Sequence, residues 1–390
     1  MVTAPPKARM KARVKAQVKA RVKAQVKARM ASLMSSRSTP LTKVPAAVRR
    51  VSSTTWRAAS TGRRRAASSV PLLAAIALVA SLAVAGCADA DERRPAVVVT
   101  TNILGDVTRR IVGDEAEVTV LMKPDADPHS FAVSAREAAV IEKAALVVHN
   151  GLGLEEGVLR NVEAAAQSGV PTLAVGEHVD PIRFATATPG DAGQADRNGA
   201  TDGGGSASEE RPDPHFWTDP RRMAMAVDVI AERITHEVDG VDAAAVRANA
   251  ARYRAEIEAL DAWIRERFAT VPPDRRKLVT NHHVFGYLAE RYGFTVVGAV
   301  IPSGTTLASP SAADLKTLAD TVRAAGVRAI FADSSQPDRL ARVLATEAGL
   351  EVRVIPLFTE SLSERREGGA TYVAMMRSNA EAMVGGLTGR

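Results

Sequence analysis

The chain contains a single cysteine, Cys87, among its 390 residues. One cysteine cannot form an intramolecular disulfide, so no disulfide framework holds the protein together. The sequence also lacks the His-Glu-x-x-His motif of zinc-dependent hydrolases, which argues against that class of enzyme. The apolar run at residues 70–85 is shorter than the roughly 20 residues that a membrane-spanning helix needs.

Acidic residues are absent from the first 86 residues, which carry 18 lysines and arginines. This basic segment is of low complexity, with residues 11–18 repeated at 19–26, and such segments are usually solvated and unfolded. Removing these 18 positive charges changes the net charge from +7 for the whole chain to −11 for residues 87–390. The basic overall composition is therefore no indication of nucleic-acid binding, and we expect no nucleic-acid partner.

Three consecutive arginines, residues 63–65, precede the apolar run 70–85 and the sequence Val-Ala-Gly-Cys that ends at Cys87. This order is typical of the charged, apolar and small-residue regions of a secretory signal. A cysteine directly after such a signal resembles the lipobox of bacterial lipoproteins, in which the cysteine is lipidated and becomes the new N-terminus. We therefore predict that residues 1–86 are removed, and that Cys87 anchors an exported protein to the outer face of the cell membrane.

About 300 residues remain, enough for two modest domains. Short apolar stretches alternate with helical patterns, which predicts parallel β-sheets. We expect strands at residues 96–100, 118–121, 146–148, 172–175, 278–281, 295–300, 328–332 and 352–357. The longest helical pattern, residues 242–268, would extend roughly 40 Å at ~1.5 Å per residue, enough to join two lobes. The prediction is an α/β protein with an N-terminal lobe (87–241), a linking helix (242–271) and a C-terminal lobe (272–390).

Residues 183–212 have almost no apolar side chains and contain the run Gly203-Gly204-Gly205-Ser206. Such composition predicts a flexible loop in the N-terminal lobe. Because the loop directly precedes His215, it suits a lid or a metal-transfer arm. A tolerated surface insertion explains the composition equally well.

Two histidines occur in similar surroundings, each after a proline and shortly before a capped helix. The sequence Asp-Pro-His-Ser-Phe at residues 127–131 precedes a capping box at 134–137. The sequence Pro-His-Phe-Trp at 214–217 precedes Asp219-Pro220, an N-cap and a proline suited to the first helical position. A histidine in a stiff loop ahead of a helix suits a metal ligand. Alternatively, the second histidine only packs against the neighbouring tryptophan.

The second half of the chain also carries polar side chains at strand ends. These candidates are His282, His283, Asp333 and Glu360. In open parallel sheets, ligands bind beyond the carboxyl ends of the strands. His129 and His215 occupy such positions in the first half, so we predict one site to which both halves contribute.

The order of five motifs resembles the metal-binding receptors of bacterial zinc and manganese ABC importers, the TroA/pneumococcal surface adhesin family. These motifs lie at residues 127–131, 150–155, 214–220, 282–287 and 358–362. The resemblance implies two α/β lobes, each a mainly parallel sheet flanked by helices, joined by one rigid helix with a metal site in the cleft. It also implies a transport component rather than an enzyme, an ABC permease as partner and a lipid anchor. We expect a monomer.

The resemblance also implies a set of metal ligands. These are His129, His215, His282 and Glu360. His283 is an alternative to its neighbour His282, and Asp333 is the rival acidic ligand or a residue that supports the site. Three imidazoles and one carboxylate suit Zn²⁺, whereas Mn²⁺, the alternative metal, prefers more oxygen ligands. A metal-dependent surface adhesin is a further alternative that the sequence does not test.

Overall fold

The computed structural model describes most of the chain after residue 93. The described residues are 94–184, 211–301, 303–349, 352–364 and 367–389. The predicted leader, the lipidation site Cys87 and most of the predicted loop 183–212 lie outside these residues. Residues 88–390 form one compact unit, to which the following description applies.

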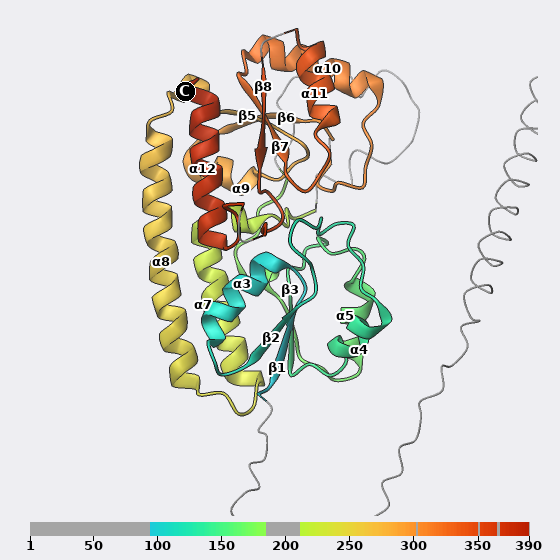
Figure 1. Cartoon of the computed structure of the whole chain (residues 1–390), viewed down its shortest axis with the longest axis vertical. Coiled ribbons are helices and arrows are strands. Elements are labelled where there is room, and N and C mark those ends of the chain that lie inside the picture. The colour runs from blue at the N-terminus through green and yellow to red at the C-terminus, as the bar shows by residue number, and fades with distance from the viewer. Residues whose placement is uncertain (1–93, 185–210, 302, 350–351, 365–366, 390) are drawn as a thin grey trace, which may run out of the picture. The chain divides into compact units, whose positions relative to one another are not determined.

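The N-terminal lobe is built on a four-stranded parallel sheet of order β2-β1-β3-β4. The strands are β1 (Ala96–Val99), β2 (Glu117–Val120), β3 (Leu146–His149) and β4 (Thr172–Ala174). The helices are α3 (Asn102–Val112), α4 (Ala135–Ile141), α5 (Leu159–Gln167) and α7 (Pro220–Glu237). Helices α4 and α5 lie on one side of this sheet, and α3 and α7 lie on the other (Figure 1).

The C-terminal lobe repeats this architecture with the parallel strand order β6-β5-β7-β8. Its strands are β5 (Lys277–Thr280), β6 (Thr295–Ala299), β7 (Ala329–Asp333) and β8 (Arg353–Leu357). Its helices are α9 (Gly286–Tyr292), α10 (Ala312–Ala325), α11 (Arg339–Glu347) and α12 (Tyr372–Thr388). All eight strands begin and end within one residue of the predicted ranges. The prediction of two parallel α/β lobes is confirmed.

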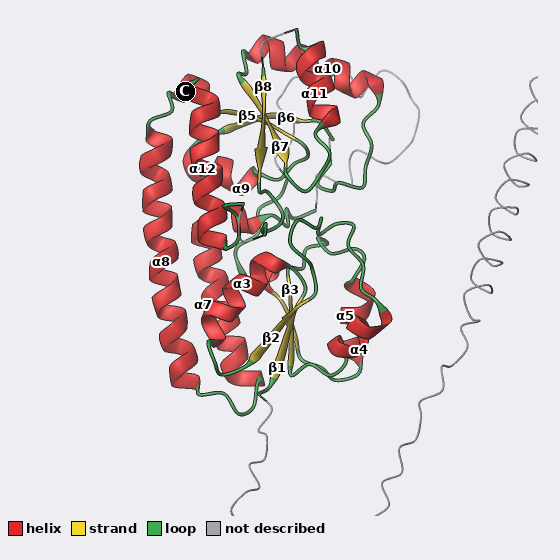
Figure 2. Ribbon diagram, viewed as in Figure 1, coloured by secondary structure: helices red, strands yellow, loops and turns green. Residues whose placement is uncertain are grey.

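Helix α8 (Ala243–Ala269) runs alongside both lobes, next to α7 of the first and α12 of the second (Figures 1 and 2). Asp242 begins it by accepting the backbone N–H groups of the first helical turn. Its buried face includes Val246, Tyr253, Ile257, Leu260, Ile264 and Phe268. These side chains belong to one apolar core that also contains residues of both sheets. Helix α8 is therefore the predicted rigid connection between the lobes.

Buried and partly buried charges reinforce the junction of α7, α8 and α9. Asp219, at the start of α7, lies 2.8 Å from Arg222 and 3.5 Å from Arg291 of α9. Arg291 also pairs with Asp261 of α8 at 2.5 Å. Because Asp219 is fully buried, these pairs compensate a charge that would otherwise be costly to bury.

The described helices include none that is both long and apolar enough to cross a bilayer.

Candidate metal centre

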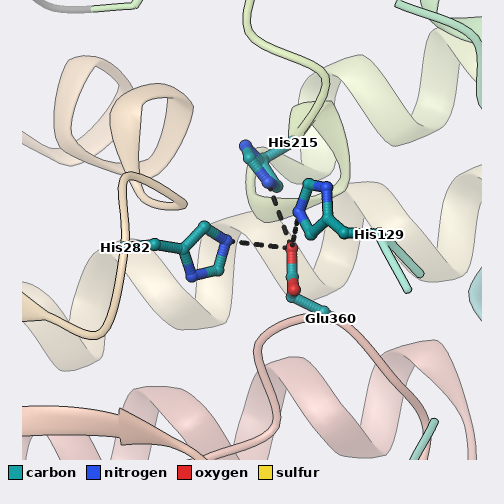
Figure 3. Close-up of side chains that lie close together, drawn as sticks. All are labelled: His129, His215, His282 and Glu360. Atoms are coloured by element: carbon teal, nitrogen blue, oxygen red, sulfur yellow. Dashed lines mark hydrogen bonds and ion pairs between the residues drawn. The ribbon is translucent and has the colours of Figure 1, made fainter. Parts of the chain in front are cut away.

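Four side chains converge in the cleft between the two lobes (Figure 3). They are His129 and His215 from the N-terminal lobe, and His282 and Glu360 from the C-terminal lobe. Each offers one ligand atom, and these four atoms lie within 4.8 Å of one another. The Nε2 atom of each imidazole is 3.1 Å from Oε1 of the carboxylate. The four side chains are 0–1% exposed, so they can enclose an ion away from solvent.

Helix capping holds the loops of the two N-terminal histidines in place. Ser134 and Glu137 form the predicted capping box at the start of α4, shortly after His129. Asp219 caps α7 as predicted by accepting the backbone N–H of Arg221 at 2.9 Å. Each histidine is thus followed within a few residues by a helix with a well-defined beginning.

The ring of His215 packs beside Trp217 and also faces the other candidate ligands. The two ring centroids are 5.3 Å apart, and the indole Nε1–H of Trp217 donates to the backbone oxygen of Thr359 at 2.8 Å. Thr359 directly precedes Glu360, so Trp217 links the loop of one candidate ligand to that of another. The two interpretations of His215 from the sequence are therefore compatible.

Asp213 determines which nitrogen of His215 faces the cleft. Its Oδ1 lies 2.6 Å from Nδ1 of the ring and accepts the backbone N–H of the same histidine at 2.9 Å. The backbone oxygen of Asp213 in turn accepts the hydroxyl of Tyr287 at 2.6 Å. A side chain at Gly286 would place its Cβ 2.6 Å from the other carboxylate oxygen, so this close approach requires glycine.

Sequence reasoning did not identify Asp213 as part of the site. The signal was present, because an aspartate lies two residues before the histidine in both Asp-Pro-His motifs.

His282 and His283 lie in the loop between β5 and α9, and only His282 reaches the other candidate ligands. Both histidines follow the end of β5, as the sequence predicted, and α9 begins only at Gly286. One local bond and one bond to a more distant loop hold the intervening residues in place. The hydroxyl of Thr280 donates to the backbone oxygen of His282 at 2.6 Å, and the backbone N–H of His283 donates to Ser303 at 3.0 Å.

The rival acidic residue Asp333 lies at the end of β7, outside the group of four ligand atoms. One carboxylate oxygen accepts the hydroxyl of Thr359, and the other accepts the backbone N–H of Ser335 at 2.6 Å. Asp333 is buried and thus supports the residue before Glu360 rather than facing the three imidazoles.

The motif at residues 150–155 supports the site without reaching it. The buried carboxylate of Glu155 accepts the hydroxyl of Thr100 and the backbone N–H of Asn150, both at 2.7 Å. The side chain of Asn150 donates to the backbone oxygen of Pro214 at 3.0 Å. Through this chain of bonds, the carboxyl ends of β1 and β3 hold the loop that carries His215.

The histidines and carboxylates of the cluster shift one another's pKa values. Burial alone would lower the pKa of His215, but the carboxylates of Asp213 and Glu360 outweigh it and raise the pKa to about 9. Burial would raise the pKa of Glu360, yet the surrounding imidazoles hold that pKa well below its usual range. The pKa of His282 is lowered, chiefly by burial. Glu360 is therefore ionised and His215 protonated at neutral pH.

Several polar atoms of the cluster lack partners. Among the described residues, Nε2 of His215 and Oε2 of Glu360 are buried without a hydrogen-bond partner, as are Nδ1 of His129 and Nδ1 of His282. Buried polar atoms are normally satisfied. Three imidazole nitrogens and a carboxylate oxygen grouped within 4.8 Å can replace the hydration shell of a divalent cation. Such an ion would give Nε2 of His215 and the carboxylate of Glu360 the partner that they lack.

A sequence profile of the family described as zinc-uptake complex component A, periplasmic, matches residues 97–386. The chain therefore belongs to this family, the metal-binding substrate-binding components of ABC metal importers, which are transport components and not enzymes. The family predicted from the five motifs is confirmed.

Relatives named for three metals resemble the chain. The zinc-binding protein TroA of Treponema pallidum is 27% identical over 305 residues, covering 76% of this chain and 90% of TroA. The manganese-binding lipoprotein MntA of Halalkalibacterium halodurans is 25% identical over 319 residues, covering 80% and 97%. The iron-binding protein YfeA of Yersinia pestis is 27% identical over 324 residues, covering 83% and 96%.

The solved structures agree with this fold. The periplasmic zinc-binding protein TroA of Treponema pallidum superposes with a TM-score of 0.65 at 26% identity, over 75% of this chain and 99% of TroA. A manganese-bound periplasmic metal-binding protein from Candidatus Liberibacter asiaticus superposes with a TM-score of 0.62 at 25% identity, over 75% and 99%. Family and fold thus define a receptor for metal ions and leave the choice of metal to the ligand set.

Proposed function

We propose that this protein captures Zn²⁺ on the outer side of the cell membrane and delivers it to the permease of an ABC importer. The proposed ligands are His129, His215, His282 and Glu360. The observation that carries the proposal is the equal separation of 3.1 Å between each imidazole Nε2 and one carboxylate oxygen. Tetrahedral zinc with bonds of about 2.0–2.1 Å separates its ligand atoms by roughly 3.3 Å, close to the spacing between each imidazole and the carboxylate, in a group whose atoms all lie within 4.8 Å of one another.

The composition of the ligand set favours zinc over manganese. Manganese prefers oxygen ligands. In addition, a given site of nitrogen and oxygen ligands binds Mn²⁺ more weakly than Zn²⁺. Only Glu360 contributes oxygen to the group of four. Asp333, the nearby carboxylate, is engaged by Thr359 and Ser335. The manganese-binding names of some relatives make Mn²⁺ the second candidate.

Sequence evidence supports the lipid anchor. Cys87 follows a signal-like segment, and several relatives are named lipoproteins. We propose that a lipid on Cys87 keeps the receptor at the membrane, close to its permease, and that the receptor is a monomer there.

Metal analysis tests the choice of ion. The purified chain, stripped with a chelator, is equilibrated with equal concentrations of Zn²⁺ and Mn²⁺, passed through a desalting column and analysed by mass spectrometry of the metals. We expect one Zn²⁺ per chain and almost no Mn²⁺. The matched variants His282→Ala and His283→Ala test the site, since only the first should lose zinc. Retention of Mn²⁺ in preference to Zn²⁺ would contradict the proposal.

A further inference from the structure

The two Asp-Pro-His motifs use their aspartates differently. Asp213 bonds to the ring of His215, as described above. Both aspartates accept the backbone N–H of their own histidine through Oδ1 at 2.9 Å, but Asp127 makes no bond to the ring, since Nδ1 of His129 has no hydrogen-bond partner. The second oxygen of Asp213 has no hydrogen-bond partner, whereas that of Asp127 accepts several hydrogen bonds.

The second oxygen of Asp127 joins the two lobes. Oδ2 accepts the hydroxyl of Ser130, in the same loop, at 2.8 Å. It also accepts the hydroxyl of Thr306 at 2.7 Å and the side-chain N–H of Gln336 at 3.0 Å. Thr306 lies between β6 and α10, and Gln336 lies between β7 and α11, so both donors belong to the C-terminal lobe.

The hydrogen bonds that Asp127 accepts lie in a buried position that strengthens them. Asp127 is only 8% exposed, so solvent screens its charge little, and hydrogen bonds to an ionised acceptor are stronger than those between neutral groups. A metal held by His129 from one lobe and by His282 and Glu360 from the other leaves when the lobes separate. Separation also breaks the bonds from Thr306 and Gln336 to Asp127.

We propose that Asp127 is a positioning residue that ties the loop of His129 to the C-terminal lobe, and thereby determines how slowly the bound metal leaves. This inference rests on the proposed function, because it takes His129 to be a ligand. The bonds across the cleft exist only with the lobes together, so they act on release. Capture begins with the lobes apart and does not depend on them.

The experiment measures Zn²⁺ release from the loaded full chain into an excess of fluorescent chelator by stopped flow. Thr306→Val removes the hydroxyl with little change of shape, and Gln336→Met removes the amide. We expect each variant to release Zn²⁺ about tenfold faster, with an association rate within about twofold of the wild type. Thr306→Ser keeps the hydroxyl, so it should release Zn²⁺ as slowly as the wild type.

Ser130→Ala is the matched control, because it removes a bond to the same carboxylate oxygen from within the N-terminal lobe. It should release Zn²⁺ within about twofold of the wild-type rate. Combining Asp127→Ala with Thr306→Val should add little to Asp127→Ala alone, because the alanine has already removed the acceptor of the Thr306 hydroxyl. Release that is as fast in Ser130→Ala as in Thr306→Val would overturn the inference, because loop stability within one lobe would then explain both.

The result also separates this inference from the proposed function. A wild-type chain that binds no Zn²⁺ would contradict the proposed function, and the release rates would then be compared with Mn²⁺ as the probe. Tight Zn²⁺ binding by the wild type, with wild-type release in both Thr306→Val and Gln336→Met, would contradict only the role of Asp127.

Discussion

The carboxylate of Asp213 lies 2.6 Å from Nδ1 of His215, and the pair is buried, with side chains 1% and 0% exposed. The carboxylate accepts a hydrogen bond from Nδ1–H, and Nε2 is the nitrogen directed at Glu360. An outer carboxylate of this kind orients a histidine ligand and makes it more basic.

Replacing this carboxylate should weaken metal binding. Asp213→Asn removes the charge that favours the orientation of His215, so we expect zinc affinity to fall on the order of 10–100-fold. Competition with a zinc chelator measures the change. Asp180→Asn is the control, because that carboxylate is 82% exposed and pairs with Arg222 instead. Wild-type affinity in Asp213→Asn would show that this hydrogen bond does not matter for binding.

Zinc binding should release a proton from His215. The pKa of this residue is about 9 in the metal-free protein, so it is protonated at pH 7.5 and must become neutral to bind an ion. We expect affinity to rise about tenfold per pH unit between pH 7 and 9, and then to level off. Calorimetry at pH 7.5, in two buffers with different ionisation enthalpies, should report about one proton released per ion. Equal heats in both buffers would contradict this.

The free energy of unfolding of the metal-free protein should fall as the pH rises, whereas the zinc affinity should rise. Because the folded-state pKa of His215 is raised, its contribution to the free energy of unfolding is complete below pH ~6.5 and is lost as the pH rises through about 9. Thermal unfolding of the stripped protein at pH 6.5 and 9.5 measures this loss, which should lower the melting temperature at pH 9.5. Asp213→Asn should reduce the difference between the two melting temperatures.

The two acidic residues of the C-terminal lobe should differ in importance. Glu360→Ala removes the one carboxylate in the group of four ligand atoms, leaving neutral ligands around a dication. Asp333→Ala removes an indirect support, which costs roughly 10–100-fold in affinity. We expect the loss in Glu360→Ala to exceed the loss in Asp333→Ala, as measured by chelator competition.

A second pair of variants separates charge from packing at these positions. Burial and the charge of Glu360 raise the pKa of Asp333 to about 7, so a neutral amide is a close substitute there. Asp333→Asn should therefore bind zinc more nearly like the wild type than Glu360→Gln does. The assignment of the fourth ligand would be wrong if Asp333→Ala abolished binding while Glu360→Ala left it unchanged.

The anchor can be tested on cells that make the full chain. We expect intact-mass measurement of the membrane fraction to find a protein that begins at a lipid-modified Cys87. Cys87→Ser should move the protein to the soluble fraction without changing the zinc affinity of the purified chain. A membrane-bound protein that still carries residues 1–86 would contradict this prediction.

Much of this protein is determined locally along its sequence. The eight strands could be predicted because each is a short apolar stretch bounded by polar residues. The capping box at Ser134 and the Asp219-Pro220 helix start could be predicted because a cap involves only the three or four residues after it. The order of strands and helices then placed the candidate site at the carboxyl ends of the sheets.

Other features are decided only by the tertiary structure. The sequence left His282 and His283 as alternatives, and in the folded protein only His282 joins the group of four, while the backbone of His283 bonds to Ser303. Similarly, the aspartates of the two Asp-Pro-His motifs have different partners. Asp127 accepts the hydroxyl of Thr306 from the other lobe, whereas Asp213 bonds to the imidazole of His215. Loop residues have no repeating backbone pattern that fixes side-chain direction, so their orientation depends on partners far away in the chain.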